Sequence, residues 1–168
     1  MNLAVRAAIK SHPGLSRLLK VLSKFAAKIK KTIDIMKMFL NKKCQVRCEN
    51  ATRWGSSFLM IASFIRAYDR GVFDGSLKCP YSRETLEVYF QILLPVYQFN
   101  LHVQKTSSNI SEVVPLLVTL KESKLRRMEL NGAAKAFCVL LIKAIEKKFL
   151  MSLIRRFIVL PRYLTLKV

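Results

Sequence analysis

The chain has 168 residues, 52% of them hydrophobic, with only five glycines and five prolines. This composition excludes a disordered, collagen-like or low-complexity chain, and the length predicts a single domain with a hydrophobic core. Thirty lysines and arginines stand against ten acidic residues, a net charge of +20, and this imbalance favours a polyanionic partner.

The positive charge is concentrated at the two ends of the chain. Residues 1–48 contain twelve basic residues and one acid, a net charge of +11, and residues 121–168 contain twelve against three, a net charge of +9. Residues 49–120 contain six of each sign and are neutral. We therefore expect one helical domain over residues 1–168, in which two basic arms, residues 1–48 and 121–168, flank a neutral middle.

Helical periodicity runs through the first basic arm. A short helix is expected over Asn2–Lys10, and Pro13-Gly14 separates it from a longer amphipathic helix over Leu15–Leu40. The apolar face of this second helix consists of Leu15, Leu18, Leu19, Leu22, Phe25, Ile29, Ile33, Met36 and Leu40, and its other side carries Lys20, Lys24, Lys28, Lys31 and Lys42.

Two further helices are predicted in the neutral middle. Ser56 and Ser57 are suited to cap a helix over residues 58–68 that ends near Gly71, and residues 74–80 are expected to form a loop. Ser82 opens the next helix, which Pro95 should kink rather than end, because the apolar run continues to Val103.

The remaining chain predicts two more helices. After a polar break at residues 107–109, a fifth helix should begin at Ser111-Glu112 and end at Leu120. Asn131-Gly132 separates it from a sixth helix over residues 133–150, and only residues 157–160 have the composition of a short strand. The expected fold class is therefore mainly α, with about six helices.

Neither a metal site nor a catalytic constellation stands out. The four cysteines lack C-x-x-C spacing and the two histidines are distant from them in sequence, so we expect no metal and no cofactor. Arg6 and Lys10 interrupt the early apolar stretch, so we expect no secretory signal, and reduced thiols in an intracellular compartment. The ten acids are scattered over helix faces, and there is no Gly-rich phosphate loop and no nucleophile pattern. We expect neither an enzyme nor a small-molecule substrate.

Four segments resemble transposases of the hAT superfamily, in the order that family has them. Thr52-Arg53-Trp54-Gly55-Ser56-Ser57 is similar to T-R-W-N-S-T-x-x-M-L, and residues 2–5 are similar to the L-N-L-A-V run after the family's C-x-x-H motif. Residues 90–120, with Leu93-Leu94-Pro95 and Val114-Pro115-Leu116, resemble the L-x-P-F … S-x-V-L-P segment, and Leu160-Pro161-Arg162-Tyr163 resembles L-D-P-R-Y-K.

The resemblance implies a helical insertion domain of an RNase H-like transposase, with the core strands largely absent. In that family three carboxylates of a DDE triad bind two divalent metals. The segments that carry them would lie upstream of Met1 and beyond Val168. The resemblance thus implies a truncated, transposon-derived protein that is catalytically inactive and located in the nucleus.

The resemblance also implies DNA contact at Arg53 and Trp54, where an indole can stack on a base and an arginine can neutralise phosphate. The alternative is that Trp54 is a core residue at a helix start and Arg53 is solvated. Lys20, Lys24, Lys28 and Lys31 are expected to contact phosphate, although such a face can also be merely solvated. Because no motif reads base edges, binding should be non-specific.

The sequence leaves two alternative interpretations open. Residues 1–33 are amphipathic, contain no acid and are typical of a mitochondrial targeting segment or of a basic helix on a membrane surface. Alternatively, the chain has no selected function, and apolar faces left uncovered by the missing core lead to self-association.

Overall fold

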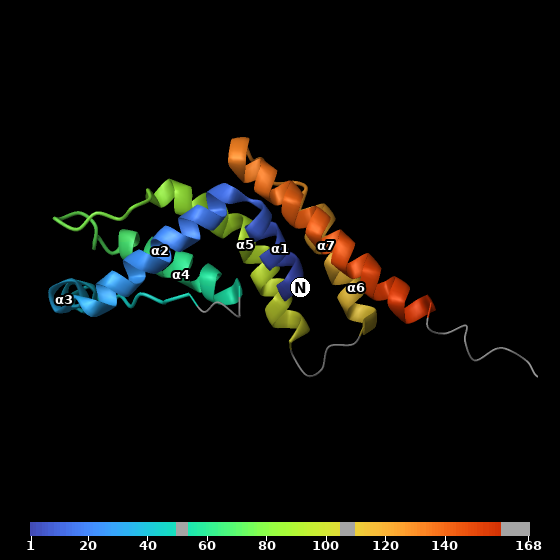
Figure 1. Ribbon diagram of the computed structural model, residues 1–168, viewed down its shortest axis with the longest axis horizontal. Helices are drawn as coiled ribbons and strands as arrows, with labels where there is room; N and C mark the ends of the chain where they lie inside the picture. The colour runs from blue at the N-terminus through green and yellow to red at the C-terminus, as the bar shows by residue number, and fades with distance from the viewer. Residues whose placement is uncertain (50–53, 105–109, 159–168) are drawn as a thin grey trace, which may run out of the picture.

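The computed structural model describes residues 1–49, 54–104 and 110–158 of the chain, with side chains at 1–49, 54–104 and 112–149. These residues form seven α-helices and one π-helical segment and contain no strand, which confirms a mainly α fold (Figure 1). In chain order the elements are α1 (Asn2–Ser11), α2 (Pro13–Lys31), α3 (Ile33–Asn41), α4 (Trp54–Asp69), α5 (Arg83–Val103), α6 (Ile110–Thr119), η1 (Leu120–Leu125) and α7 (Gly132–Ile158).

His12 forms the junction between α1 and α2. It has an extended backbone, and α2 begins directly at Pro13 rather than after Gly14, since proline suits the first helical position. The His12 side chain caps α2, because its Nδ1 accepts a hydrogen bond from the backbone N–H of Leu15 at 3.0 Å. Its Nε2 donates to the carbonyl of Ala133 at 3.0 Å and so ties this junction to the start of α7.

The prediction of one helix over Leu15–Leu40 is wrong, because the helix breaks at Thr32. Thr32 is extended, at φ −103° and ψ 110°, and α3 starts as a separate element. Two local features favour the break: β-branched Thr32 and Ile33 are adjacent, and basic residues end α2 while Asp34 opens α3, as the helix dipoles prefer. The break turns part of the expected apolar face away from the core.

The described residues after α3, 42–49, lie along α4. Lys43 has a positive φ of 53°, which ends α3, and Cys44 and Val46 then alternate into the core. The backbone N–H of Arg47 donates to Ser63 Oγ at 3.2 Å. Cys44 and Cys48 therefore lie on a segment without helical structure.

The two helices predicted in the middle of the chain are found, but the expected cap of the first is wrong. α4 begins at Trp54, so Ser56 and Ser57 lie inside the helix and do not cap it, and Gly71, with φ 65°, follows its end. Ser82 caps α5 by accepting a hydrogen bond from the Thr85 N–H at 3.3 Å, and α5 continues through Pro95 to Val103, as predicted.

The C-terminal helix is longer than expected. α7 continues to Ile158, so the strand-like interpretation is wrong for residues 157–158, while residues 159–160 lie outside the described residues. The polar break at residues 107–109 also lies outside them. The fifth helix is found as α6, and the chain then continues into the π-helical turn η1.

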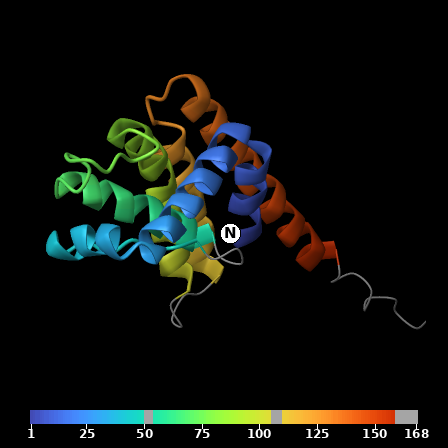
Figure 2. The same cartoon turned by 60° about the vertical axis from the view of Figure 1, so that its left-hand side comes forward.

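The buried side chains of every element join one hydrophobic cluster. α1 lies along α7, and α4 packs against α5, as both views of the ribbon show (Figures 1 and 2). His12 lies inside this core, with edge contacts to the rings of Tyr89 and Phe137. The first and last helices of the chain are therefore neighbours, which brings the two basic arms together.

Candidate nucleic-acid interface

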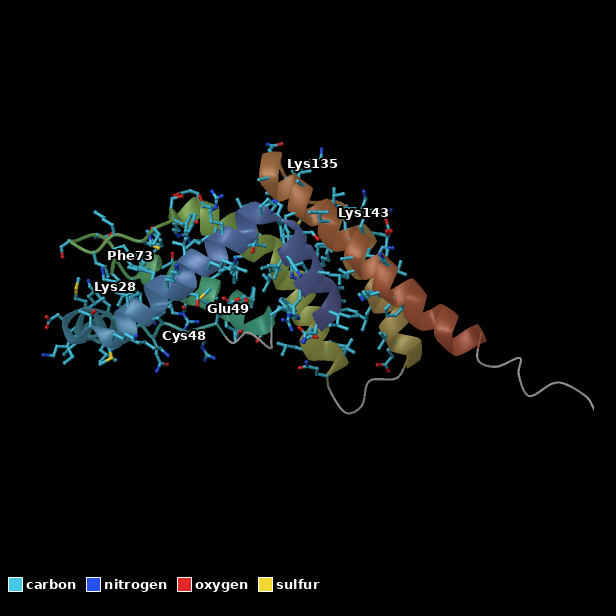
Figure 3. All side chains as sticks on the ribbon, viewed as in Figure 1. Lys28, Cys48, Glu49, Phe73, Lys135 and Lys143 are labelled. Atoms are coloured by element: carbon cyan, nitrogen blue, oxygen red, sulfur yellow. The ribbon has the colours of Figure 1, made fainter. Side chains whose placement is uncertain are left out.

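The four predicted lysines of α2 share one exposed face, which we call the lysine face: Lys20, Lys24, Lys28 and Lys31. Their spacing places them opposite the buried Leu15, Leu22 and Ile29. Along the helix they span about 16 Å, and Lys28 lies toward the α3 end of α2 (Figure 3). All ten acidic residues are described, and none of them forms an ion pair with this face.

One end of the lysine face opens into a cavity of about 590 Å³ between α1, α2 and the start of α4. Its charged lining consists of Arg6, Lys10 and Lys20 against Glu49 alone. The Glu49 carboxylate accepts a hydrogen bond from Ser57 Oγ at 2.6 Å, which fixes it to α4. The excess of cations makes this cavity suited to an anionic group.

Trp54 lines the same cavity from the first position of α4. Only 4% of its surface is exposed, and its ring makes an edge contact with Tyr97, whose ring stacks on Phe58 at 4.4 Å. Trp54 is therefore a core residue at a helix start, and a base could stack on the indole only if the indole turned out of this packing. Arg53 lies outside the described residues.

A second cavity of about 370 Å³ lies between α1 and α7. Three exposed lysines of α7 line it, and Ala7 of α1 lines both cavities, so the two adjoin along α1. We call the six cations around them the basic cleft: Arg6, Lys10, Lys20, Lys143, Lys147 and Lys148. Lys143 is seen along α7 in Figure 3.

Two of the three acids of the second basic arm, Glu122 and Glu146, are paired outside this cleft. Glu146 is engaged by Lys121 at 2.8 Å and by Arg126 at 3.4 Å, and Arg126 also pairs with Glu122 at 2.8 Å. The two pairs with Glu146 join η1 and its C-terminal end to α7. No lysine of the cleft forms an ion pair with any described carboxylate.

The structure brings together two of the six predicted contact residues, Lys20 and Trp54, in one cavity, while Lys24, Lys28 and Lys31 continue along α2 away from it. Sequence reasoning did not select Arg6 and Lys10, or the three lysines of α7. All five belong to the two basic arms, so their charge was recognised as part of a possible anion-binding surface. No local sequence pattern indicates that the two arms meet in the fold.

The described residues offer no metal centre, since they contain no group of three or more His, Cys, Asp and Glu placed to hold an ion. The four cysteines are free. Burial raises the pKa of the Cys79 and Cys138 thiols, which disfavours the nucleophilic thiolate. In the described part of the chain, no helix is long and apolar enough to cross a membrane.

No family model, curated protein or solved structure matches the chain.

Proposed function

We propose that this chain is a non-enzymatic, transposon-derived protein similar to hAT transposases, which binds DNA non-specifically and acts in the nucleus. The observation that carries the DNA-binding proposal is the basic cleft. Six cations from opposite ends of the chain surround two adjoining cavities, and Glu49 is the one carboxylate in their lining. The lysine face extends the cleft along α2.

The lysine face suits the phosphate backbone in size and chemistry. Duplex DNA carries a negative charge for about every 1.7 Å of its axis, so a face about 16 Å long meets several phosphates. Five of the six cleft cations are lysines, which bind phosphate as point charges without reading base edges. Binding of this kind is independent of sequence and falls steeply with salt.

The transposase origin rests on the four ordered sequence segments, of which Thr52–Ser57 is the most distinctive. In that family, cleavage requires carboxylates that hold two metal ions. The matched segments do not include those carboxylates, so the proposed role is binding without cleavage. Cleavage of a nicked duplex in the presence of Mg²⁺, retained through a purification that removes contaminating nucleases, would overturn the non-enzymatic part of the proposal.

The test is fluorescence anisotropy with a labelled duplex over a series of salt concentrations. In the face variant, the four lysines at positions 20, 24, 28 and 31 become glutamine. A matched control variant loses the same charge elsewhere on exposed positions: Lys78→Gln, Lys124→Gln, Arg127→Gln and Lys135→Gln. Each lost phosphate contact reduces the slope of log K against log salt by about 0.9.

The face variant is therefore expected to lose about 3 to 4 from that slope, and the control should lose little. Equal losses in both variants would show that net charge alone attracts DNA, and would refute a defined interface. The absence of binding by the folded wild-type protein at low salt would refute DNA binding altogether.

A further inference from the structure

The helix α3 presents an apolar surface that the core does not cover. Ile33, Met36 and Leu40 are 64%, 40% and 58% exposed, and their spacing places them on one side of the helix. We call these three residues the apolar tip. The break at Thr32 produces this exposure, because a continuous helix would have carried the same three side chains along the apolar face of α2.

The apolar tip is held by a fixed element. Phe39 anchors α3 in the core, where it is 2% exposed and makes an edge contact with Phe73 at 5.8 Å. At the end of α3 the Arg70 guanidinium donates hydrogen bonds to the carbonyls of Lys42 and Lys43. The core packing of Phe39 and the hydrogen bonds from Arg70 therefore fix the position of the apolar tip.

Lysines surround the apolar tip. Lys37 lies within α3, Lys31 precedes the helix by two residues, and Lys42 and Lys43 follow its end directly; all four are exposed. Against them stands a single acid, Asp34, in the first turn of α3. Both views place α3 at the end of the molecule opposite α7, so α3 lies far from the α7 side of the basic cleft (Figures 1 and 2).

We propose that the apolar tip and its lysines form a docking surface for an anionic phospholipid bilayer. A bilayer offers negative headgroups next to an apolar layer, which matches lysines around exposed aliphatic side chains. A second copy of the chain matches it poorly, since its own lysines would face these. DNA satisfies the lysines but leaves the apolar side chains in water.

The test is flotation of the full chain with vesicles of phosphatidylcholine, with and without phosphatidylserine as the anionic lipid. The tip variant carries Ile33→Ser, Met36→Ser and Leu40→Ser. Its matched control carries Leu101→Ser, Val118→Ser and Val139→Ser, which remove apolar side chains of similar exposure from other helices. Both variants must keep the wild-type circular dichroism spectrum.

We expect the wild type to bind vesicles with phosphatidylserine, the tip variant to bind about tenfold more weakly, and the control to bind as the wild type does. Replacing Lys37, Lys42 and Lys43 with glutamine should weaken binding as well. Equal binding to both vesicle types, or equal loss in tip variant and control, would overturn the proposal. A dimer in solution that the tip variant dissociates would overturn it in favour of a second copy.

A measurement of DNA binding by the tip variant tests the lipid-docking proposal separately from the proposed DNA-binding function. The tip residues do not line the basic cleft, so the tip variant should keep the wild-type affinity for DNA over the full salt series. Loss of DNA binding in the tip variant would contradict a separate lipid surface and assign the tip to the nucleic-acid interface.

Discussion

Replacing His12 with alanine should destabilise the protein strongly, because one buried ring joins three helices. His12 is only 6% exposed. Its ring caps α2 by accepting a hydrogen bond from the Leu15 N–H, and it donates a hydrogen bond to the Ala133 carbonyl at the start of α7. Loss of a cap costs about 1 kcal/mol, and loss of the partly buried hydrogen bond to the Ala133 carbonyl costs about 0.5 to 1.5 kcal/mol. Edge contacts with two aromatic rings add about 0.5 to 1.5 kcal/mol each.

Together these contributions predict a loss of about 4 kcal/mol in the free energy of unfolding, a large part of the 5 to 15 kcal/mol typical of a domain. Urea unfolding followed by circular dichroism measures it. The variant His12→Asn is the matched control, since asparagine keeps a capping oxygen but cannot reach Ala133 in the same way, and it should recover about 1 kcal/mol. A loss below about 1 kcal/mol for His12→Ala would refute the assignment of this junction as a structural centre.

Three further predictions concern single residues. Glu49→Gln should tighten DNA binding about fivefold, because it removes a like charge worth about 1 kcal/mol near the phosphates while its amide oxygen still accepts from Ser57; unchanged anisotropy would contradict this. Trp54→Ala should cost about 3 to 5 kcal/mol in urea unfolding, since the indole is buried; a small loss would contradict core packing. Burial raises the pKa of Cys138, so a thiol reagent at pH 8 should label it only slowly until denaturant is added; rapid labelling of the native protein would contradict that burial.

Most helices could be predicted from the sequence, because each buries one stripe of side chains and so leaves a periodic pattern. The break at Thr32 could not, since the apolar spacing continues across it. Phe39 is buried in place of the expected Leu40, and its edge contact is with Phe73, from a loop more than thirty residues later. A tertiary contact therefore decided which side of α3 faces the core.

At the end of α7 the sequence pattern predicted a change from helix to strand, whereas the structure has a continuous helix. Phe157 and Ile158 have the local composition of a strand, yet they continue a helix that begins at Gly132. Helix extension adds one hydrogen bond for each residue that is fixed, so an established helix can override a weak local preference. A short β-like composition was too weak a signal to end it.

The lysine face could be predicted because it depends on α2 alone. The basic cleft could not, because it depends on α1 lying along α7, and the contact that marks this arrangement joins His12 to Ala133 across 121 positions. The Glu49–Ser57 hydrogen bond was missed for a related reason, since it bridges an extended link and a helix start. Charge counting identified the two basic arms but contained no information on their meeting.

The most direct test of the central claim is whether both basic arms contribute to one DNA-binding surface. Two variants divide the basic cleft: one replaces Arg6, Lys10 and Lys20 with glutamine, and the other replaces Lys143, Lys147 and Lys148. The slope of log K against log salt, measured by fluorescence anisotropy, should decrease by about 2 to 3 in each variant, because each loses three phosphate contacts. A decrease confined to one variant would contradict a shared cleft, and an unchanged slope in both would contradict DNA binding at this site.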